Sequence, residues 1–423
     1  MKNPGKLPFS TPIYYGWFIL FIAALSVFFS GPGQTFTISI FIDSYVEDFG
    51  WSRSLISSLY LGATLLAGSL LFLVGRSIER WGSRTISVMV AIMLAAACFW
   101  NSFVAGPIML FIGFLMLRLF GQGSMMLVPN TLLPQWFIKQ RGRAYSLLGV
   151  GSFLGFLLFP VTTNWLIETW GWAEAWRVWG LLLLLGFVPL AWLLIRNRPE
   201  DVGLKPDSPS ARKSKVDTSG AVVADVPEVE WTLQEAFRTR AFWCFLFCIT
   251  VPALVNTGII FHLPSIVEAH DISSSAAALS LSVMALVSFP FTFAAGFLNE
   301  RVKVHLVIGW LFLLQVVSMI ILAYTQSYTV LILFSVVRGV VQGFEGVSLN
   351  LVWPTYFGKK AIGSIKSLTM TAVVMGSAFG PLPFGLAFDL WGGYTEILLI
   401  MTLLPLVAMI AAWLSPPPRK DGA

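Results

Sequence analysis

The sequence predicts an all-α membrane protein with twelve transmembrane helices in two pseudo-symmetric six-helix halves. Three observations support this fold class: an apolar composition, twelve long hydrophobic segments and a repeat that relates the two halves of the chain. Hydrophobic residues make up 57% of the chain and charged residues only 11%, whereas soluble proteins carry about 25% charged residues. A polypeptide of this composition is expected to lie in a bilayer.

Twelve segments are long and apolar enough to cross the hydrocarbon core of a membrane, which takes about 20 residues of helix. Short turns rich in charged residues, glycine or proline separate most of them. In chain order the predicted spans are residues 14–44, 54–76, 84–102, 107–137, 143–168, 175–196, 241–267, 274–297, 304–324, 328–355, 362–389 and 394–415.

One long polar segment, residues 197–240, separates the sixth predicted span from the seventh. Its content of Pro, Ser, Lys and Asp is too polar to bury an apolar core, so we expect a cytoplasmic linker. The predicted domains are therefore an N-terminal six-helix half (residues 1–196), this linker and a C-terminal six-helix half with a short tail (residues 241–423). Near the end of the linker, Thr232 and Glu235 have the spacing of a capping box and predict a short helix.

The basic residues predict the orientation of the chain. With the N- and C-termini in the cytoplasm, the cytoplasmic segments hold 23 of the 27 Lys and Arg residues, as expected from the retention of positive loops on that side. Arg53 and Arg177 then lie outside, and Arg118 and Arg338 lie within the membrane. The net charge of +6 follows from this distribution and needs no nucleic-acid partner. We expect a multi-pass protein of the cell inner membrane.

The two halves of the chain repeat one another at a nearly constant offset. Six residues recur 220 positions later, and a second group recurs 221 positions later. The first group pairs Arg118, Gln122, Gly123, Asn130, Pro134 and Phe137 with Arg338, Gln342, Gly343, Asn350, Pro354 and Phe357, and the second includes Gly75, Glu79 and Arg80 with Gly296, Glu300 and Arg301. Parallel repeats of six spans describe a transporter architecture whose substrate site lies at mid-membrane between the repeats.

Four short motifs carry a family resemblance. The loop GRSIERWGSR (Gly75–Arg84) resembles the signature loop of the major facilitator superfamily, G-x-x-x-D-R-x-G-R-K, with Glu79 for the usual Asp and Ser83 for the usual basic residue. The stretches YYGW, FGWSRSLIS and WFIKQRGRAYSLLGVGS are similar to motifs of the bacterial monocarboxylate-porter and oxalate/formate-antiporter group. The resemblance implies the major facilitator fold and a secondary active transporter that works by alternating access as a monomer. It further implies that a small organic anion, a monocarboxylate, moves with a proton.

The chain departs from that group at the anion clamp, the basic residue that binds the substrate carboxylate. Members typically carry a basic residue in helix 8, but the eighth predicted span, SSAAALSLSVMALVSFPFTFAAG, has no charged residue. An anion would therefore have to use Arg118, Arg338, backbone amides or neutral donors. The alternative is an efflux carrier for amphiphilic neutral or weakly basic compounds, which would suit an aromatic-rich cavity without a clamp.

Arg118, Arg338 and Glu345 lie within predicted spans, where each charge costs about 2.5 to 3.5 kcal/mol on insertion scales. Arg338, Gln342 and Glu345 share one helix face. Each arginine either donates to helix-end carbonyls or binds a substrate carboxylate through its planar fork. Glu345 has three open interpretations: a static ion pair with an arginine, a proton-coupling site, or a contact to a cationic or hydroxylated substrate.

Neutral polar residues supply further candidates for substrate binding. Gly31–Gly33, with a central proline, weakens the first predicted span beside Gln34, and interrupted helices are a pointer to midplane sites. We expect Gln34, Gln122, Gln342 and Asn256 in or near the cavity, and interhelical hydrogen bonds are the alternative role for them.

His262 is the only histidine deep within a predicted span, since His305 stands at the very start of the ninth. Because histidine ordinarily changes its charge near neutral pH, His262 joins Glu345 as a candidate for proton coupling. The alternative is a hydrogen-bonded, partly hydrated histidine without such a role.

The signature loop and its repeat supply candidates for conformational control. These residues lie at cytoplasmic helix ends, where their charges are expected to form ion pairs that hold one face closed and separate when the halves move. They are Gly75, Glu79, Arg80, Gly82, Arg84, Glu300 and Arg301.

Other classes of protein lack support in the sequence. The chain contains no G-x-S-x-G, no H-E-x-x-H and no G-x-x-x-x-G-K-[ST], and its three histidines are too few for a ligand set. We therefore expect no enzyme, no catalytic residues, no metal and no cofactor. The expected partners are a small-molecule substrate, a proton or counter-ion and the lipid bilayer.

Overall fold

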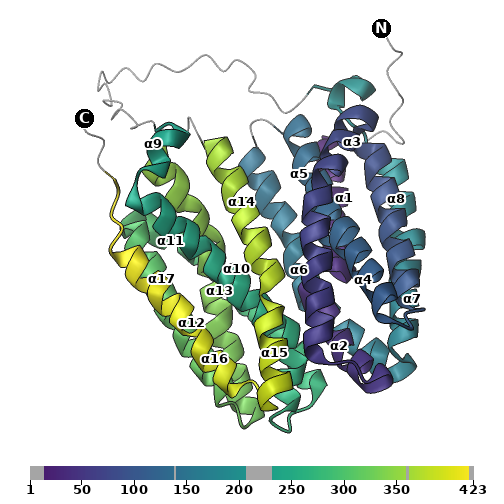
Figure 1. Cartoon of the computed structure of the whole chain (residues 1–423). Helices are drawn as coiled ribbons and strands as arrows, with labels where there is room; N and C mark the ends of the chain where they lie inside the picture. The colour runs from purple at the N-terminus through teal and green to yellow at the C-terminus, as the bar shows by residue number, and fades with distance from the viewer. Residues whose placement is uncertain (1–13, 138–139, 206–230, 359–361, 419–423) are drawn as a thin grey trace. The chain divides into compact units, whose positions relative to one another are not determined.

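The computed structural model describes residues 14–137, 140–205, 231–358 and 362–418, and every regular element within these ranges is a helix (Figure 1). The predicted all-α class is confirmed. Within the described ranges, eleven helical stretches are long and apolar enough to cross a membrane. The count is eleven rather than the predicted twelve because the 49-residue α3 (Arg53–Asn101) contains both the second and the third predicted spans.

Gly82 breaks α3 into the two predicted spans. Its φ of 83° and ψ of 156° are non-helical, and a positive φ of this size favours glycine. A Cβ at this position would also lie 2.5 Å from Nδ2 of Asn197. The Asn197 side chain occupies that space because its Oδ1 accepts the backbone N–H of Arg84 at 2.9 Å. The signature loop therefore contains the break between the two spans.

The chain divides into two compact units whose boundaries differ from those of the predicted halves. One unit comprises Met1–Ile38 and Leu66–Ala224, and the other comprises Ser39–Leu65 and Asp225–Ala423. The end of α2 (Thr35–Phe49) and the start of α3 therefore belong with the C-terminal helices. The division at residues 197–240 stays a proposal based on the repeat, and most of that linker lies outside the described residues.

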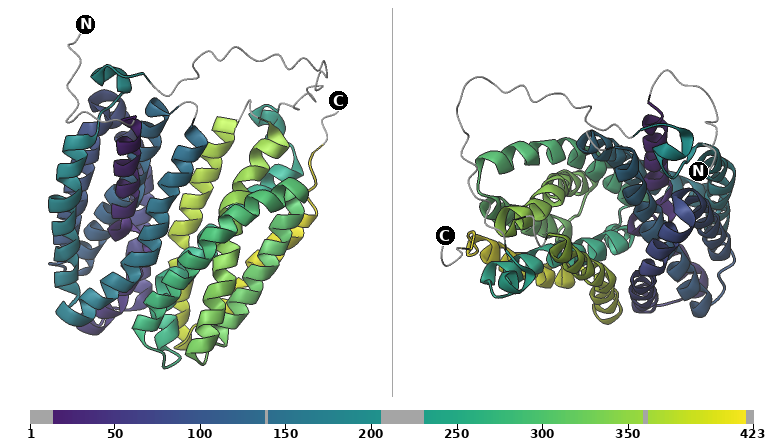
Figure 2. Two further views of the ribbon diagram at one scale, coloured as in Figure 1. Left: turned by 180° about the vertical axis from the view of Figure 1, so that it is seen from behind. Right: turned by 90° about the horizontal axis from the view of Figure 1, so that it is seen from above.

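In the first unit the long helices run alongside one another (Figure 2), and α1 packs against α5 and α6. Besides parts of α2 and α3, its elements are α1 (Gly16–Phe29), η1 (Gly31–Gly33), α4 (Pro107–Met116), η2 (Leu117–Ser124), α5 (Met125–Trp136), α6 (Arg141–Trp170), α7 (Trp172–Leu182), η3 (Leu183–Phe187), α8 (Val188–Leu194) and η4 (Pro199–Val202).

The first predicted span is interrupted, as its glycines and proline predict. The helix α1 ends at Phe29, η1 forms a single 3₁₀ turn, and Gln34 is extended before α2 begins. A Cβ on Gly33 would lie only 2.2 Å from the carbonyl oxygen of Leu117 in the π-helical segment η2. Glycine is required for this close approach of η1 to η2. The corresponding stretch of the seventh span stays helical through Pro252.

In the second unit α10 packs against α14, α15 and α17, and α13 packs against α11 and α12. The elements of this unit, besides the end of α2 and the start of α3, are α9 (Leu233–Phe237), α10 (Arg240–Glu268), α11 (Ser274–Arg301), α12 (Val304–Ala323), α13 (Tyr328–Phe357), α14 (Ile362–Phe379), α15 (Pro381–Trp391), α16 (Thr395–Met401) and α17 (Leu403–Trp413).

The capping box predicted before the seventh span is confirmed. Thr232 Oγ1 accepts the backbone N–H of Glu235 at 3.3 Å, and the Glu235 carboxylate accepts the backbone N–H of Thr232 at 2.8 Å. These two bonds satisfy amide groups that the first turn of α9 would otherwise leave unpaired.

Large apolar side chains remain exposed on the long helices. Ile108, Leu185 and Leu390 are each at least three quarters exposed. Contiguous apolar surface is uncommon on soluble monomers, whereas lipid tails solvate such side chains. The exposed apolar residues therefore agree with the assignment of a multi-pass membrane protein.

Candidate functional site

The helix α13 brings together two of the charged residues predicted from the sequence. Arg338 and Glu345 stand seven residues apart on one face, and Arg338 Nη2 donates to Glu345 Oε2 at 3.3 Å. Their side chains are only 4% and 11% exposed. The predicted ion pair between Glu345 and an arginine is therefore present, and its partner is Arg338.

Two carboxamides from neighbouring helices extend this pair into what we call the Glu345 network: Arg338, Glu345, Asn256 and Gln315. Asn256 of α10 donates through Nδ2 to Glu345 Oε2 at 3.1 Å. Gln315 of α12 donates through Nε2 to Asn256 Oδ1 at 3.1 Å. The network thus joins three helices. Asn256 makes hydrogen bonds between helices, which is the role predicted for it as the alternative to substrate binding.

Gln315 is absent from the site residues predicted by sequence, although the chain carries a signal for it. The helix α12 is the most apolar of the candidate spans, and Gln315 is a lone carboxamide near its middle. A buried carboxamide needs hydrogen-bond partners, so its presence in such a helix indicates a polar neighbour. That neighbour, Asn256, lies 59 positions away in sequence and could not be identified without the fold.

Each member of the Glu345 network except Asn256 keeps one buried polar atom without a partner among the described residues. These atoms are Glu345 Oε1, Arg338 Nη1 and Gln315 Oε1. A buried polar atom that makes no hydrogen bond is costly. The network therefore has a satisfied part, centred on Glu345 Oε2, and unsatisfied donor and acceptor atoms that a ligand or a proton can engage.

In the first unit, Arg118 lies in η2 and is buried. Its Nη1 donates to the carbonyl oxygen of Gly33 and to Thr35 Oγ1, both at 3.4 Å. Gly33 ends η1, so Arg118 makes the contact to a helix-end carbonyl that its structural interpretation predicts. Arg118 and Arg338 therefore occupy equivalent sequence positions but have different partners.

The glutamines predicted to line the cavity have different environments. Gln34 donates through Nε2 to Ser30 Oγ at 3.0 Å and lies 3.4 Å from the Met126 sulfur atom. The side chains of Gln122 and Gln342 are half-buried, and neither makes a hydrogen bond to another described residue. Substrate binding by these three glutamines stays a proposal.

The signature loop is held mainly by Gly82 and Arg84. Besides the bond to Asn197, Arg84 donates through Nε to the Trp192 carbonyl at 2.9 Å and stacks on the Trp192 ring. Gly75 is half-buried, and a Cβ added at this position would have no other atom within 4 Å.

The predicted ion-pair latches are not seen in the described part of the chain. Glu79, Arg80 and Arg301 are exposed there and form no ion pair with another described residue. The side chain of Glu300 lies outside the described part of the structure. The latches therefore stay a prediction.

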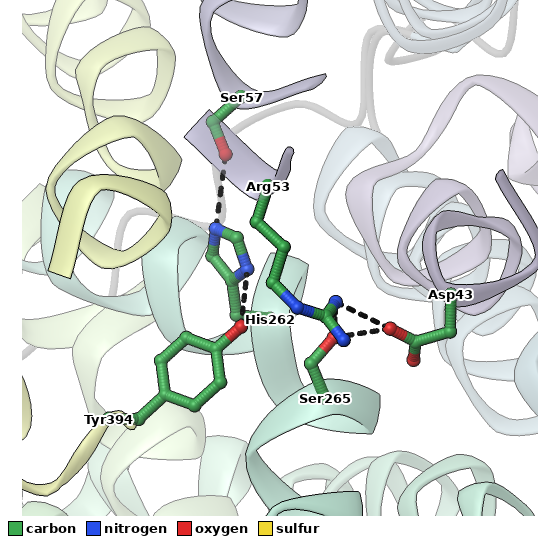
Figure 3. Close-up of polar contacts among 6 residues, drawn as sticks. All are labelled: Asp43, Arg53, Ser57, His262, Ser265 and Tyr394. Carbon is green, nitrogen blue, oxygen red and sulfur yellow. Dashed lines mark hydrogen bonds and ion pairs between the residues drawn. The ribbon is translucent and has the colours of Figure 1, made fainter. Parts of the chain in front are cut away.

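A second polar group, the Asp43 cluster, gathers six residues of the second unit: Asp43, Arg53, Ser57, His262, Ser265 and Tyr394 (Figure 3). Arg53, at the start of α3, donates through Nη1 to Asp43 Oδ1 at 2.5 Å and also to Ser265 Oγ. Ser265 Oγ in turn donates to Asp43 Oδ1 at 2.6 Å. The Arg53 guanidinium also lies over the Phe388 ring, with Cζ 4.8 Å from its centroid.

His262 is the part of this cluster that the sequence singled out. It is 0% exposed, so the partly hydrated environment expected for it is wrong. Its Nε2 lies 3.0 Å from the Pro381 carbonyl and 3.1 Å from Ser57 Oγ, and Nδ1 lies 3.3 Å from the Tyr394 hydroxyl. Because a carbonyl only accepts, we place the ring proton on Nε2, so Nδ1 accepts from Tyr394. A neutral ring is fully bonded, and proton coupling by His262 stays a proposal.

Tyr394 lies between α15 and α16, outside the candidate spans. Burial raises the pKa of the Tyr394 phenol above its ordinary value, because the charged phenolate is poorly solvated there. The hydroxyl therefore stays protonated and available as a donor to His262.

Asp43 and Arg53 are also absent from the predicted site residues. Asp43 falls inside the first predicted span, and Arg53 is one of the two basic residues on the predicted outer side. Two charges of opposite sign close to one interface are a signal for an ion pair. The third member of that contact, Ser265, is 212 positions away from Arg53, and only the fold reveals it.

The fold agrees with the comparison to protein families. The model of the Major Facilitator Superfamily matches residues 16–381 and, again, residues 253–423. The chain belongs to this superfamily. The family and the fold are those of membrane transporters rather than of enzymes.

Individual relatives are distant and differ in what their names describe. The chain is 24% identical to monocarboxylate transporter 9 of Gallus gallus over 48% of its own length, and it spans only 38% of that relative. It is 21% identical to the aspyridones efflux protein apdF of Emericella nidulans, over 93% of this chain and 77% of the relative.

Among solved structures, a bacterial homologue of the human lysosomal transporter Spinster superposes with a TM-score of 0.75. The superposition covers 96% of this chain and 98% of the other, at 15% sequence identity. This likeness shows the major facilitator fold, as predicted from the signature loop and the repeat.

Proposed function

We propose that this transporter is a proton-coupled carrier for a small organic anion, a monocarboxylate in the first instance, and that it works by alternating access. The observation that carries the proposal is the buried pair of Arg338 and Glu345, each with one unpartnered atom. A cation that can bind a carboxylate and a carboxyl group that can bind a proton are thus joined in one network.

Arg338 is the proposed replacement for the missing anion clamp of the eighth span. Its Nη2 is engaged by Glu345 Oε2, while its Nη1 is buried without a described partner. A guanidinium offers donors in a planar fork that matches the oxygens of a carboxylate. Nη1 is therefore the proposed donor to the substrate, and Gln342, one turn along the same helix, is a proposed neighbour of that substrate.

Glu345 is the proposed proton-coupling residue. Its Oε2 accepts from both Asn256 and Arg338, whereas Oε1 accepts from no described residue. A proton can therefore bind Oε1 without breaking either bond to Oε2. This division of the carboxylate lets Glu345 change its charge while the three helices stay connected.

The charge balance of the pair links the proton to the anion. When Glu345 is ionised, its negative charge compensates the positive charge of Arg338. An incoming anion then gains little electrostatic attraction from Arg338. A proton on Glu345 leaves the Arg338 charge uncompensated, which favours the anion. By reciprocity the bound anion then favours the proton. Joint binding of this kind is what symport of an acid requires.

A second candidate function is efflux of an amphiphilic neutral or weakly basic compound. The relative matched over 93% of this chain is named as an efflux protein, whereas the monocarboxylate transporter aligns with only 48% of it. The absence of a charged residue from the middle of α11 also suits a ligand without a carboxylate.

Lumenal pH in proteoliposomes that contain the purified protein distinguishes the two candidates. Short monocarboxylates, dicarboxylates and amphiphilic amines are added one at a time, with protein-free liposomes as the control for passive diffusion. We expect acidification above the control for a monocarboxylate. No response to any acid, together with a response to an amine, would replace the anion proposal with efflux.

A further inference from the structure

The part of α3 beyond the break at Gly82 lies antiparallel to α7 and α8 in the first unit. Near one end of this contact, Arg84 Nε of α3 donates to the Trp192 carbonyl of α8 at 2.9 Å. Near the other end, a Cβ on Gly180 of α7 would lie 3.0 Å from a ring atom of Phe99. The contacting residues follow opposite sequence orders, so the helices stay together from one membrane boundary toward the other.

Two arginines lie close together at the end of this contact. The Arg84 side chain is half-buried and stacks on the Trp192 ring, with Cζ 4.4 Å from the ring centroid. Arg196 follows α8 and donates through Nη1 to the carbonyl oxygens of Leu193 and Ile195, at 2.9 Å and 2.8 Å. The positive charge of Arg196 is near enough to Arg84 to repel it. An aromatic ring holds one guanidinium and the end of a helix holds the other.

This pair of positive charges has no acidic partner in the described part of the chain. No described carboxylate forms an ion pair with Arg84 or Arg196. The acidic residues nearest to them in sequence, Glu79, Glu200 and Asp201, are exposed. Apart from Arg84 Nε and Arg196 Nη1, the N–H groups of both guanidiniums bond to no described residue. A bound anion would relieve the repulsion between the two charges.

A phosphate group matches the N–H groups that remain available. Guanidinium N–H groups bind phosphate oxygens in bidentate geometry. A ring stacked on one face of the Arg84 guanidinium leaves the N–H edge open for such bonds. Basic residues beside a membrane span also gain about 1 kcal/mol each from anionic lipid headgroups. The chemistry of this pair therefore favours a phosphate with a net negative charge.

The surroundings of the two arginines favour a lipid over a free anion. Trp192 is 53% exposed, and exposed tryptophans are typical of the headgroup level of a membrane. Exposed apolar side chains continue from there along both helices, with Ile92 and Met93 on α3 and Leu185 in η3. Ile92 lies about 12 Å further along α3 than Arg84, toward the middle of the membrane. Acyl chains attached to the phosphate would cover this apolar surface.

We propose that Arg84, Arg196 and Trp192 bind the phosphate of an anionic membrane lipid, whose acyl chains lie along the exposed apolar surface of α3 and α8. The two guanidiniums donate to the phosphate, and the Trp192 ring holds Arg84 in place. The predicted orientation puts this site at the cytoplasmic boundary of the bilayer. The site belongs to the first unit, so it does not depend on the substrate or on proton coupling by Glu345 in the second.

Native mass spectrometry of the purified protein in detergent measures lipid binding directly. The probes are dioleoyl phosphatidylglycerol and dioleoyl phosphatidylcholine, which have the same acyl chains but differ in net charge. We expect the first phosphatidylglycerol to bind about tenfold more tightly than phosphatidylcholine, or more, since two arginines contribute. Glycerol 3-phosphate in large molar excess is the probe for a free phosphate. It should not displace phosphatidylglycerol, because it lacks acyl chains.

The double substitution Arg84→Gln with Arg196→Gln should raise the Kd for phosphatidylglycerol about tenfold or more and leave that for phosphatidylcholine unchanged. Arg196→Gln alone should give a smaller increase and serves if the double variant does not fold, because Arg196 bonds only to carbonyls of its own segment. Arg177→Gln is the matched control. Arg177 also stacks on a ring, that of Phe103, but it has Glu174 as an ion-pair partner. The Kd of this control should equal that of the unsubstituted protein.

The lipid site is overturned by any of three results. Equal Kd values for the two lipids would show that the site does not select a negative charge. An unchanged Kd for phosphatidylglycerol in both arginine variants would show that the lipid binds elsewhere. Displacement by glycerol 3-phosphate would assign the two arginines to a free phosphate instead. Because no transported substrate is added, these results are independent of the proposed anion transport.

Discussion

Arg338 donates to only one oxygen of Glu345, Oε2, and the same oxygen accepts from Asn256, so Oε1 stays open for a proton. This arrangement differs from a bidentate ion pair, in which both oxygens are engaged and protonation breaks a bond. The open oxygen is the geometric basis of the proposed proton coupling by Glu345.

Arg338→Lys should impair anion transport more than Arg118→Lys does. Lysine keeps the positive charge at position 338 but loses the planar fork, so we expect the KM for a transported acid to rise by about tenfold or more. Arg118 already donates to the Gly33 carbonyl and Thr35, a contact in which an ammonium group can replace a guanidinium. Initial uptake rates into proteoliposomes at several acid concentrations test this difference. Equal effects of the two substitutions would count against Arg338 as the clamp.

Gln315→Leu should weaken the Glu345 network by removing the hydrogen bond from Gln315 to Asn256. Asn256 Oδ1 would lose its donor, and an unsatisfied buried acceptor costs about 1–3 kcal/mol. We therefore expect a lower melting temperature and a changed pH profile of uptake, because Asn256 no longer holds Glu345 Oε2 in place. The matched control is Ser318→Ala, since Ser318 Oγ donates only to the main-chain carbonyl of Gln315 at 2.7 Å. A shift in stability without a shift in the pH profile would reduce Gln315 to a purely structural role.

Gly33→Ala should destabilise the first unit. The added methyl group would lie 2.2 Å from the Leu117 carbonyl and 2.7 Å from the Gly121 Cα, so η1 and η2 would have to separate. Overpacking of this kind typically costs about 1–3 kcal/mol, and here backbone must move. Gly149→Ala is the control, because a Cβ added at Gly149 would have no atom within 4 Å. Thermal unfolding in detergent should show a clear decrease in Tm for Gly33→Ala alone.

Much of this architecture can be predicted from local properties of the sequence. Hydropathy depends on consecutive residues, so the boundaries of α10 and α12 lie within one residue of their predicted spans. The break at Gly82 and the interruption at Gly31–Gly33 are likewise encoded by the residues at those positions. In each case the chain carries its signal within a few positions of the feature.

The sites are less predictable because their partners are distant in sequence. Arg338 and Glu345 share one helix, so their contact follows from helical spacing. The bonds from Asn256 to Glu345 and from Arg53 to Ser265 join residues 89 and 212 positions apart, and only tertiary packing brings them together. The full burial of His262 has the same origin, because α15 and Tyr394 cover its ring.

The most direct test of proton coupling is Glu345→Gln in proteoliposomes, with the acid that acidifies the lumen in the substrate panel. Two quantities are measured for the same preparation: accumulation of the labelled acid driven by an imposed pH gradient, and exchange of labelled for unlabelled acid without a gradient. Because glutamine preserves the shape of the side chain but cannot bind a proton, we expect accumulation to be lost and exchange to persist. Undiminished accumulation in Glu345→Gln would contradict the role of Glu345 as the proton-coupling residue.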